Sequence, residues 1–369
     1  MARSDKVQSM RIGILGGGMN SAVGNVHRTA LRVAGGTEIV GGKFSRDSKV
    51  NADSHYWWAC LNKAPYASIE EMKAASEEFD LVLILTPPDE HSNAIIDFMK
   101  LGKKIITEKP TVSSLKEIKN IENNTNELEK NLRTTYNYSG YPMVRDLKEK
   151  IANRLFGDIL NIRIEMFQEG FIKLDKEGKP FQPQPWRLKD NEIPTVSLDL
   201  GTHVLHLLYF LTGDLLNQGM TFSTSEGHFN VIDRVEILGR TSTGISTNLG
   251  WGKTSLGYQN GLKIELFGNQ GSAIWIQNYP EELRLADSRG EVRILTRGNP
   301  SCDIANLPRY TRFKGGHPSG FIEAFANVYE DFINYEADSS FSYDHYGFDV
   351  SKKIFENLNR IHGTWAKNF

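Results

Sequence analysis

The stretch Arg11-Ile12-Gly13-Ile14-Leu15-Gly16-Gly17-Gly18 decides the fold, because a short apolar run passes directly into three glycines. A strand, a glycine turn and a helix start together form an anion site. The missing side chains let the backbone approach a pyrophosphate, and the first turn of the helix supplies N–H groups. The spacing departs from G-x-G-x-x-G, since the third glycine is either absent or displaced to Gly24. The candidate dinucleotide contacts here are Gly16, Gly18, Met19 and Asn20.

The same residues also fit a glycine turn in another α/β protein, so the segments that follow must decide whether this is a dinucleotide-binding fold. Residues 37–44, 81–85, 104–107 and 132–136 read as strands, of which 81–85 is a continuous apolar run, and residues 114–130 read as a charged amphipathic helix. Strands and helices alternate, which predicts a doubly wound, mostly parallel Rossmann sheet. Ligands of such sheets bind beyond the carboxyl ends of the strands.

Polar residues at these strand ends are therefore candidate cofactor contacts. Ser45 and Arg46 follow the second strand, where an acidic side chain would bind a ribose 2′-OH and an arginine suits a 2′-phosphate. This favours NADP, while Asp47 one step further keeps NAD open. The remaining candidates at strand ends are Thr86, Pro87, His91, Glu108 and Lys109.

A second candidate site lies in the apolar helical pattern of residues 197–208. Asp199 and His203 are four residues apart and share one helix face. A carboxylate beside an imidazole orients the ring and suits it for general acid/base chemistry near neutral pH. The spacing fits a purely structural Asp–His contact equally well. A metal site that includes His206 is disfavoured by its spacing and its leucine-rich surroundings, and we expect no metal.

The rest of the chain predicts a second domain at residues 138–369, after a dinucleotide-binding domain at residues 1–137. Alternating runs between residues 158 and 296 predict an α+β domain with a large, mostly antiparallel open sheet. A polar loop at residues 171–187 suits a lid or a binding loop. The candidate substrate contacts are Asn137, Tyr138, Trp186, Arg187 and His203.

One face of such a sheet needs a cover, and we expect Trp251, Trp275, Tyr279 and Phe267 to supply an apolar surface there. A homodimer or homotetramer built through this sheet is therefore expected.

Composition narrows the class of protein. The 369 residues are 39% apolar and 24% charged, with a net charge of −2. This balance gives no electrostatic footprint for nucleic acid or an anionic membrane, and no apolar run reaches the length of a membrane span. The polar first ten residues lack a signal-peptide core, and two distant cysteines suggest free thiols in a reducing cytoplasm.

Several of these motifs occur together and in a fixed order. The glycine loop, Thr86-Pro87 with His91, Glu108-Lys109-Pro110 and the Asp199–His203 pair resemble the Gfo/Idh/MocA oxidoreductases. The resemblance implies that Lys109, Asp199 and His203 line a catalytic site and that a Rossmann domain binds NAD or NADP. It also implies oxidation or reduction of a hydroxyl or keto carbon on a sugar, cyclitol or sugar nucleotide, in a homo-oligomer.

Two features leave alternatives open. Residues 193–196, Ile-Pro-Thr-Val, replace the glycine run that many members carry before the aspartate, so the loop on the substrate side must differ. Some proteins of this fold use the same dinucleotide as glycosidases or lyases, and others only sense it without catalysis. Lys109 and His203 are both present at the motif positions, which favours an enzyme over a protein that only senses the dinucleotide.

Overall fold

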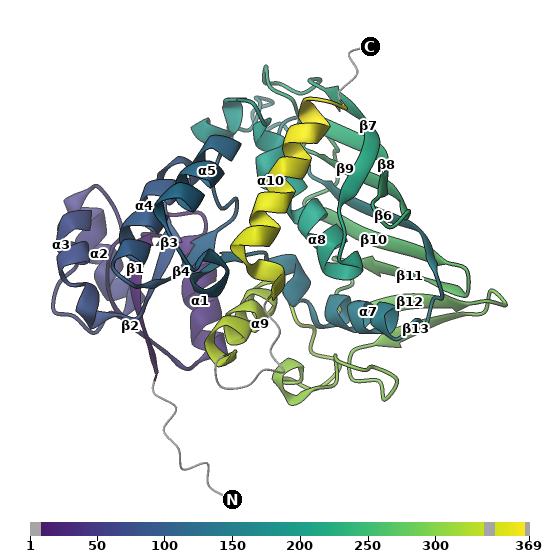
Figure 1. Ribbon diagram of the computed structural model, residues 1–369, viewed down its shortest axis with the longest axis horizontal. Coiled ribbons are helices and arrows are strands. Elements are labelled where there is room, and N and C mark those ends of the chain that lie inside the picture. Colours follow the sequence, from purple (N-terminus) through teal and green to yellow (C-terminus); the bar gives the residue numbers. More distant parts are fainter. Residues whose placement is uncertain (1–8, 336–343, 366–369) are drawn as a thin grey trace, which may run out of the picture. The chain divides into compact units, whose positions relative to one another are not determined.

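The computed structural model describes residues 9–335 and 344–365 (Figure 1). Residue contacts group them into two compact units. Unit 1 comprises the described residues of 1–137 and 321–351, and unit 2 those of 138–320 and 352–369. We expected every residue after 137 to belong to the second domain, but the contacts place the segment 321–351 with the first unit.

Unit 1 contains a parallel five-stranded sheet in the order β2-β1-β3-β4-β5, as the sequence predicted. The strands are β1 (Met10–Gly16), β2 (Thr37–Lys43), β3 (Leu81–Leu85), β4 (Lys104–Glu108) and β5 (Leu132–Thr135). The helices between them are α1 (Gly24–Ala34), α2 (Ser48–Trp58), α3 (Ile69–Ala74), α4 (Pro88–Lys100), α5 (Leu115–Asn124) and α6 (Leu128–Asn131). All five residues of β3 are buried, which is typical of a central parallel strand that is covered on both faces.

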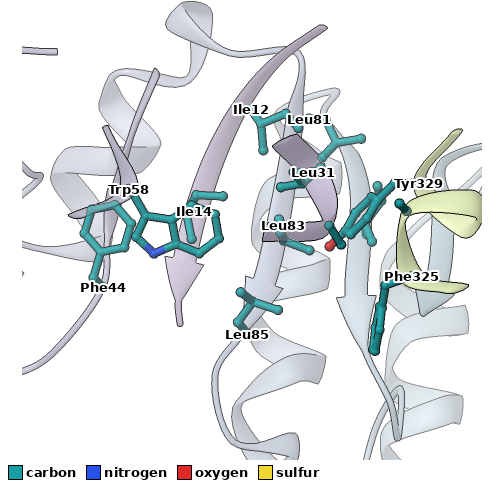
Figure 2. Packing of buried hydrophobic residues seen from close by; sticks show 13 residues of the cluster. Ile12, Ile14, Leu31, Phe44, Trp58, Leu81, Leu83, Leu85, Phe325 and Tyr329 are labelled. Atoms are coloured by element: carbon teal, nitrogen blue, oxygen red, sulfur yellow. The ribbon is translucent and has the colours of Figure 1, made fainter. Parts of the chain in front are cut away.

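Helix α9 (Phe321–Asn334) completes the core of this unit. Its Phe325 and Tyr329 pack with Leu31 of α1 and with residues of β1 and β3 (Figure 2). Its partner helix α1 lies about 300 positions earlier in the chain, so this packing joins segments that are distant in sequence.

The predicted helix at residues 114–130 is interrupted. Helix α5 ends at Asn124, and Thr125 has extended backbone angles. The Thr125 hydroxyl donates to the carbonyl of Ile121. Asparagine and threonine are poor helix formers because their side chains compete for nearby backbone groups, and residues 123–126 contain only these two types. The short helix α6 follows separately.

Unit 2 contains an eight-stranded sheet in the order β13-β12-β11-β10-β6-β9-β8-β7, antiparallel except for the parallel pair β6 and β9. Its strands are β6 (Ile159–Phe167), β7 (Leu216–Thr224), β8 (Arg234–Thr241), β9 (Ser246–Gly252), β10 (Gly261–Gly268), β11 (Gly271–Ile276), β12 (Glu282–Asp287) and β13 (Val292–Thr296). Helices α7 (Pro142–Ala152) and α8 (Thr202–Thr212) pack on one face of this sheet. Helix α10 (Phe348–His362) begins in unit 1 and continues into unit 2.

Side chains alternate between the two faces of this sheet, which corrects one expectation. Trp251 and Trp275 are fully buried on the face that the helices cover, in phase with Leu249 and Ala273. The opposite face carries exposed Met220, Phe222, Leu238, Ile276 and Ile294. The alternation of side chains along each strand is visible in the sequence, but it does not determine which of the two sheet faces packs against the helices.

Candidate functional site

The glycine loop of unit 1 has the tight backbone that the sequence predicted. Gly16 and Gly17 have φ angles of +83° and +64°, which side chains with a Cβ rarely adopt. A Cβ on Gly16 would lie 2.7 Å from the backbone of Leu85 and Thr86. A Cβ on Gly24 would lie 2.4 Å from the carbonyl oxygen of Gly17. Gly24 therefore permits the close approach of helix and loop that the third glycine of the motif normally permits.

A pocket of about 430 Å³ lies at the carboxyl ends of β1, β2 and β3. Seven predicted cofactor contacts line it: Gly16, Gly18, Asn20, Ser45, Arg46, Thr86 and Pro87. The Thr86 hydroxyl is buried and has no hydrogen-bond partner among the described residues. A glycine cradle and an unsatisfied hydroxyl at strand ends fit a bound dinucleotide.

The end of β2 is shaped by helix α2. The Asn51 side chain accepts hydrogen bonds from the backbone N–H groups of Phe44 and Ser45 at 2.7 and 3.3 Å. Asp47 caps the helix by accepting from the N–H of Val50 at 2.8 Å. Lys43 also lines the pocket, although the sequence analysis did not single it out.

Arg46 is mostly exposed and forms an ion pair with Glu90 of α4. Both residues line the pocket. The pocket therefore has, at the end of β2, an arginine that is paired with a carboxylate. The side chain of Asp47, on which the alternative of NAD binding depended, instead caps helix α2.

Four other predicted cofactor contacts do not line this pocket: Met19, His91, Glu108 and Lys109. Met19 is exposed, and its N–H donates to the Ser54 hydroxyl. His91 is fully buried, with Nε2 2.8 Å from the carbonyl oxygen of Thr86. Burial lowers the pKa of His91, and its Nδ1 lies 3.1 Å from the carbonyl oxygen of Pro110 and 3.2 Å from the Thr107 hydroxyl. His91 thus fixes the loop after β3 through the carbonyl of Thr86, without lining the pocket itself.

Glu108 is the third, and it belongs to a buried polar network at the end of β4. Its Oε1 accepts from the Thr135 hydroxyl at 2.6 Å and lies 3.3 Å from Nε2 of His27. Nδ1 of His27 is 2.6 Å from the Tyr329 hydroxyl on α9. Burial alone raises the pKa of Glu108, but contacts from His27, Thr135 and the charge of Lys109 together lower it. The network fixes the backbone from which Lys109 projects.

In unit 2, the predicted Asp199–His203 helix begins with a π-helical turn, Ser197–Gly201, before α8. The Thr202 N–H bonds to the carbonyl of Ser197, five residues earlier. The Trp251 indole packs against this turn, and a Cβ on Gly201 would lie 2.8 Å from its ring. Single π-helical turns are frequent at functional sites because they rotate the side chains that follow.

Asp199 is 4% exposed and is contacted by two cations. Lys253 Nζ lies 2.8 Å from Oδ2 of Asp199, and Arg187 Nε lies 3.0 Å from the same oxygen. The sequence predicted Arg187 as a substrate contact. In the structure its guanidinium donates to the carboxylate of Asp199 and, at 2.8 Å, to the side chain of Gln184. Trp186 stacks under the guanidinium and donates to the same Gln184 oxygen.

His203 is 4% exposed, and its ring meets the ring of Tyr138 edge to face, with centroids 4.7 Å apart. The Tyr138 hydroxyl accepts from Asn260 at 2.8 Å. Asn137, the preceding residue, is also buried, and its amide nitrogen has no partner among the described residues. Unit 2 thus brings Asp199 together with Arg187, and His203 together with Tyr138. Lys109 belongs to unit 1.

Sequence reasoning missed Lys253, Gln168, Asn260 and His27. No motif marks these residues, and their contacts depend on strand pairing and helix packing between distant segments. Among the described residues, no group of three His, Cys, Asp or Glu side chains is placed to hold a metal ion. No helix in the described part of the chain combines the length and apolarity needed to cross a membrane.

A parallel sheet with a glycine cradle and a strand-end pocket defines a dinucleotide-binding protein of the Rossmann type. The model of an oxidoreductase family with an NAD-binding Rossmann fold matches residues 10–136, and the C-terminal domain model of the same family matches residues 144–274. The chain therefore belongs to the Gfo/Idh/MocA oxidoreductase family and is an oxidoreductase.

Curated relatives and a solved structure extend this similarity over most of the chain. An uncharacterised oxidoreductase, YfiI, of Bacillus subtilis (strain 168) is 26% identical over 88% of this chain and 84% of its own length. Glucose-6-phosphate 3-dehydrogenase from the same organism is 23% identical over 75% of this chain and 77% of its own. The crystal structure of an inositol dehydrogenase homologue from Azotobacter vinelandii, complexed with NAD+, has a TM-score of 0.85 at 21% identity. It covers 97% of this chain and 95% of that chain.

Proposed function

We propose that the protein is an NAD(P)-dependent dehydrogenase or reductase that acts on a hydroxyl or keto carbon of a sugar, cyclitol or sugar nucleotide. The observation that carries the proposal is the strand-end pocket of unit 1, where the glycine cradle, Ser45-Arg46 and Thr86-Pro87 converge. The substrate class is supported by relatives that are named as acting on glucose 6-phosphate or as inositol dehydrogenase homologues.

Each proposed residue role follows from its charge and surroundings. The backbone of residues 16–18 holds the pyrophosphate of the dinucleotide, whose nicotinamide supplies or accepts the hydride. His203 takes the proton of the substrate hydroxyl during oxidation, and the ammonium of Lys109 stabilises the developing alkoxide. Asp199, held as a carboxylate by its two cations, anchors the substrate-side residues.

We further propose a preference for NADP over NAD. Arg46 and Lys43 are the cationic side chains that line the pocket, and the Asp47 carboxylate beside them is taken up by the helix cap. A 2′-phosphate suits such an edge better than a 2′-hydroxyl, because it forms a charge-assisted bond with a guanidinium.

The cofactor proposal is tested by titrating the purified protein with NADPH and with NADH while following nucleotide fluorescence. We expect tighter binding of NADPH, and Arg46→Ala should weaken NADPH about tenfold while NADH affinity stays the same. Arg32→Ala, at an exposed position on α1, is the matched control. Tighter binding of NADH would contradict the preference for NADP, and binding of neither nucleotide would contradict the oxidoreductase proposal.

The catalytic proposal is tested with Lys109→Ala and His203→Ala in a screen of sugars and cyclitols. Because proton transfer and charge stabilisation each contribute about a hundredfold or more, kcat should fall by at least that factor in each variant. NADPH affinity should change little. Wild-type turnover in either variant would refute the assigned role. Release of an aglycone without net cofactor reduction would instead indicate a glycosidase.

We also propose that the protein is a homodimer or homotetramer assembled through the exposed face of the unit 2 sheet. The apolar side chains on that face support this proposal. Cys60 and Cys302 are both free thiols, which agrees with a reducing compartment such as the cytoplasm.

A further inference from the structure

The carboxylate of Asp199 is enclosed by two cations that come from different elements of unit 2. Lys253 directly follows β9, and Arg187 lies in the loop before the π-helical turn. Both contact Oδ2 of Asp199, at 2.8 and 3.0 Å, and a second guanidinium nitrogen lies 3.5 Å from Oδ1. Two cations within ion-pair distance favour the ionised form of a buried carboxylate.

Lys253 differs from Arg187 because it also begins a chain of hydrogen bonds. Its Nζ donates to Oε1 of Gln168 at 2.9 Å, and Nε2 of Gln168 donates to Oδ1 of Asn260 at 2.8 Å. Nδ2 of Asn260 then donates to the Tyr138 hydroxyl at 2.8 Å. The Tyr138 ring lies edge to face against His203.

The direction of this chain is determined at its first residue. An ammonium group only donates, so Gln168 must turn its oxygen toward Lys253 and its NH2 group toward Asn260. Asn260 must in turn direct its NH2 group at Tyr138. A neutral side chain at position 253 would remove this constraint on Gln168 and weaken it at Asn260, whose NH2 group also donates to Oε1 of Gln277 at 2.6 Å.

We propose that Lys253 is a positioning residue of the active site: it holds Asp199 ionised and orients the polar chain Gln168–Asn260–Tyr138 that ends beside His203. The proposal rests on the dehydrogenase function proposed above. Arg187 shares the first of these tasks only, because it bonds to Asp199 and Gln184 rather than to the chain.

The two tasks have separate kinetic signatures. The charged groups of Arg187 from the loop and Lys253 from the end of β9 lie within ion-pair distance of Asp199, and His203 follows four residues later in the chain. On the other side of the π-helical turn, His362 of α10 contacts Ser197. Removing one cation leaves the negative charge of Asp199 less compensated, which favours protonation of the proposed base His203, so the acid limb of the kcat/KM profile should move to higher pH. Disorder in the amide chain should instead raise KM without moving that limb.

The test compares four variants of the full-length enzyme with NADP+ as hydride acceptor and its best sugar or cyclitol substrate. Lys253→Met should lower kcat/KM at least tenfold and shift the acid limb upward by about one pH unit. Lys253→Arg should restore the limb. Arg187→Met should shift the limb without an equal rise in KM, and Gln168→Leu should raise KM severalfold and leave the limb in place. NADPH affinity should be unchanged throughout.

Two controls separate this role from a merely structural one. Arg154→Met, at an exposed arginine that pairs with Asp158, should behave as wild type. Thermal unfolding of Lys253→Met, Asp199→Asn and the double variant should show that the two losses in Tm are not additive, as for contacting residues.

If folded Lys253→Met keeps the wild-type kcat/KM and acid limb, the inference is wrong, even where its Tm falls. A Gln168→Leu variant with unchanged KM would refute the role of the chain, which keeps the proposal testable should Lys253→Met not fold. An inactive wild-type protein that binds NADPH but oxidises no sugar or cyclitol would instead refute the proposed function, and this inference with it.

Discussion

At the scale of single residues, the π-helical turn is held by a histidine that no motif marks. Nε2 of His362 lies 2.9 Å from the hydroxyl of Ser197, and the indole of Trp251 donates to the same hydroxyl at 2.9 Å. Ser197 therefore accepts from Trp251 and donates to a neutral His362. Burial lowers the pKa of His362 to about 4 from an ordinary value of 6.5.

This pKa shift predicts a loss of stability in mild acid. Between about pH 6.5 and pH 4, His362 is protonated in the unfolded chain but stays neutral in the folded chain. The free energy of unfolding should therefore decrease as the pH falls through this range, by up to about 1.4 kcal/mol per pH unit from this residue. His91, whose pKa burial also lowers, adds to the same slope.

Urea unfolding of His362→Gln at several pH values between 4.5 and 7.5 checks this prediction. The slope of unfolding free energy against pH should be about 1 kcal/mol per pH unit smaller than in wild type. His317→Gln, at an exposed position, should keep the wild-type slope. An unchanged slope in His362→Gln would mean that the ring takes up its proton equally in the folded and unfolded states.

The residues of the candidate site divide into those with a local signal and those without one. Gly16 and the pair Asp199–His203 were proposed from the sequence because their spacing has a physical reason, and Lys109 because of its place at a strand end and the family resemblance. Lys253 was not, because its contact with Gln168 arises from the parallel register of β6 and β9, which pairs Phe167 with Gly252. A register between distant strands leaves no mark on either segment alone.

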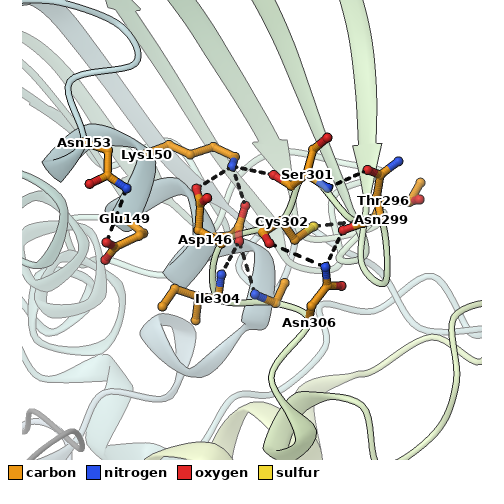
Figure 3. A network of polar contacts seen from close by, with 12 residues as sticks. Asp146, Glu149, Lys150, Asn153, Thr296, Asn299, Ser301, Cys302, Ile304 and Asn306 are labelled. Carbon is orange, nitrogen blue, oxygen red and sulfur yellow. Dashed lines mark hydrogen bonds and ion pairs between the residues drawn. The ribbon is translucent and has the colours of Figure 1, made fainter.

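At the scale of elements, a buried ion pair on helix α7 anchors the loop after β13 (Figure 3). Asp146 is fully buried, and its Oδ1 accepts from the N–H groups of Ile304 and Ala305 at 2.8 and 3.2 Å. Lys150, one helical turn later, lies 3.2 Å from the other oxygen of Asp146 and 2.7 Å from Asp303. These side chains replace the ladder bonds that an irregular loop lacks.

Asp146→Ala should therefore destabilise the protein by about 3 kcal/mol, because it leaves two backbone donors without their acceptor and removes one of the two carboxylates that pair with the buried Lys150. Equilibrium unfolding in urea measures this loss. Glu149→Gln on the same helix changes a weaker contact with Asn153, and its effect should stay within about 0.5 kcal/mol. A loss of less than 1 kcal/mol in Asp146→Ala would show that water replaces the buried contacts.

Element boundaries also show where local propensity stops being informative. Strand β3 was predictable because a buried parallel strand is a continuous apolar run, and the other strands of unit 1 were predictable from their alternation with helical segments. The break after Asn124 and the π-helical turn at Ser197–Gly201 were not predicted. The break follows from side chains that compete for the backbone. The turn depends on Trp251 and His362, which contact it from distant segments.

At the scale of the whole molecule, the outer face of the unit 2 sheet presents an apolar surface across its β7 edge. Met220 and Leu238 are directly paired across β7 and β8 and are 45% and 62% exposed. Phe222 lies two residues further along the same face. Exposed apolar groups that cluster on one sheet face are typical of a subunit interface, in agreement with the proposed homo-oligomer.

Leu238→Asp should therefore dissociate the homo-oligomer, because it places a carboxylate beside Met220 in an interface that excludes water. Sedimentation velocity should show one species of the monomer mass of 41.6 kDa, against a dimer or tetramer for wild type. Since position 238 is exposed within a single chain, the unfolding free energy of the separated subunit should change by less than about 0.5 kcal/mol. Leu174→Asp, at an exposed loop position, should leave the assembly intact. A Leu238→Asp protein that retains the wild-type mass would place the interface elsewhere, and a monomeric wild-type protein would refute the assembly itself.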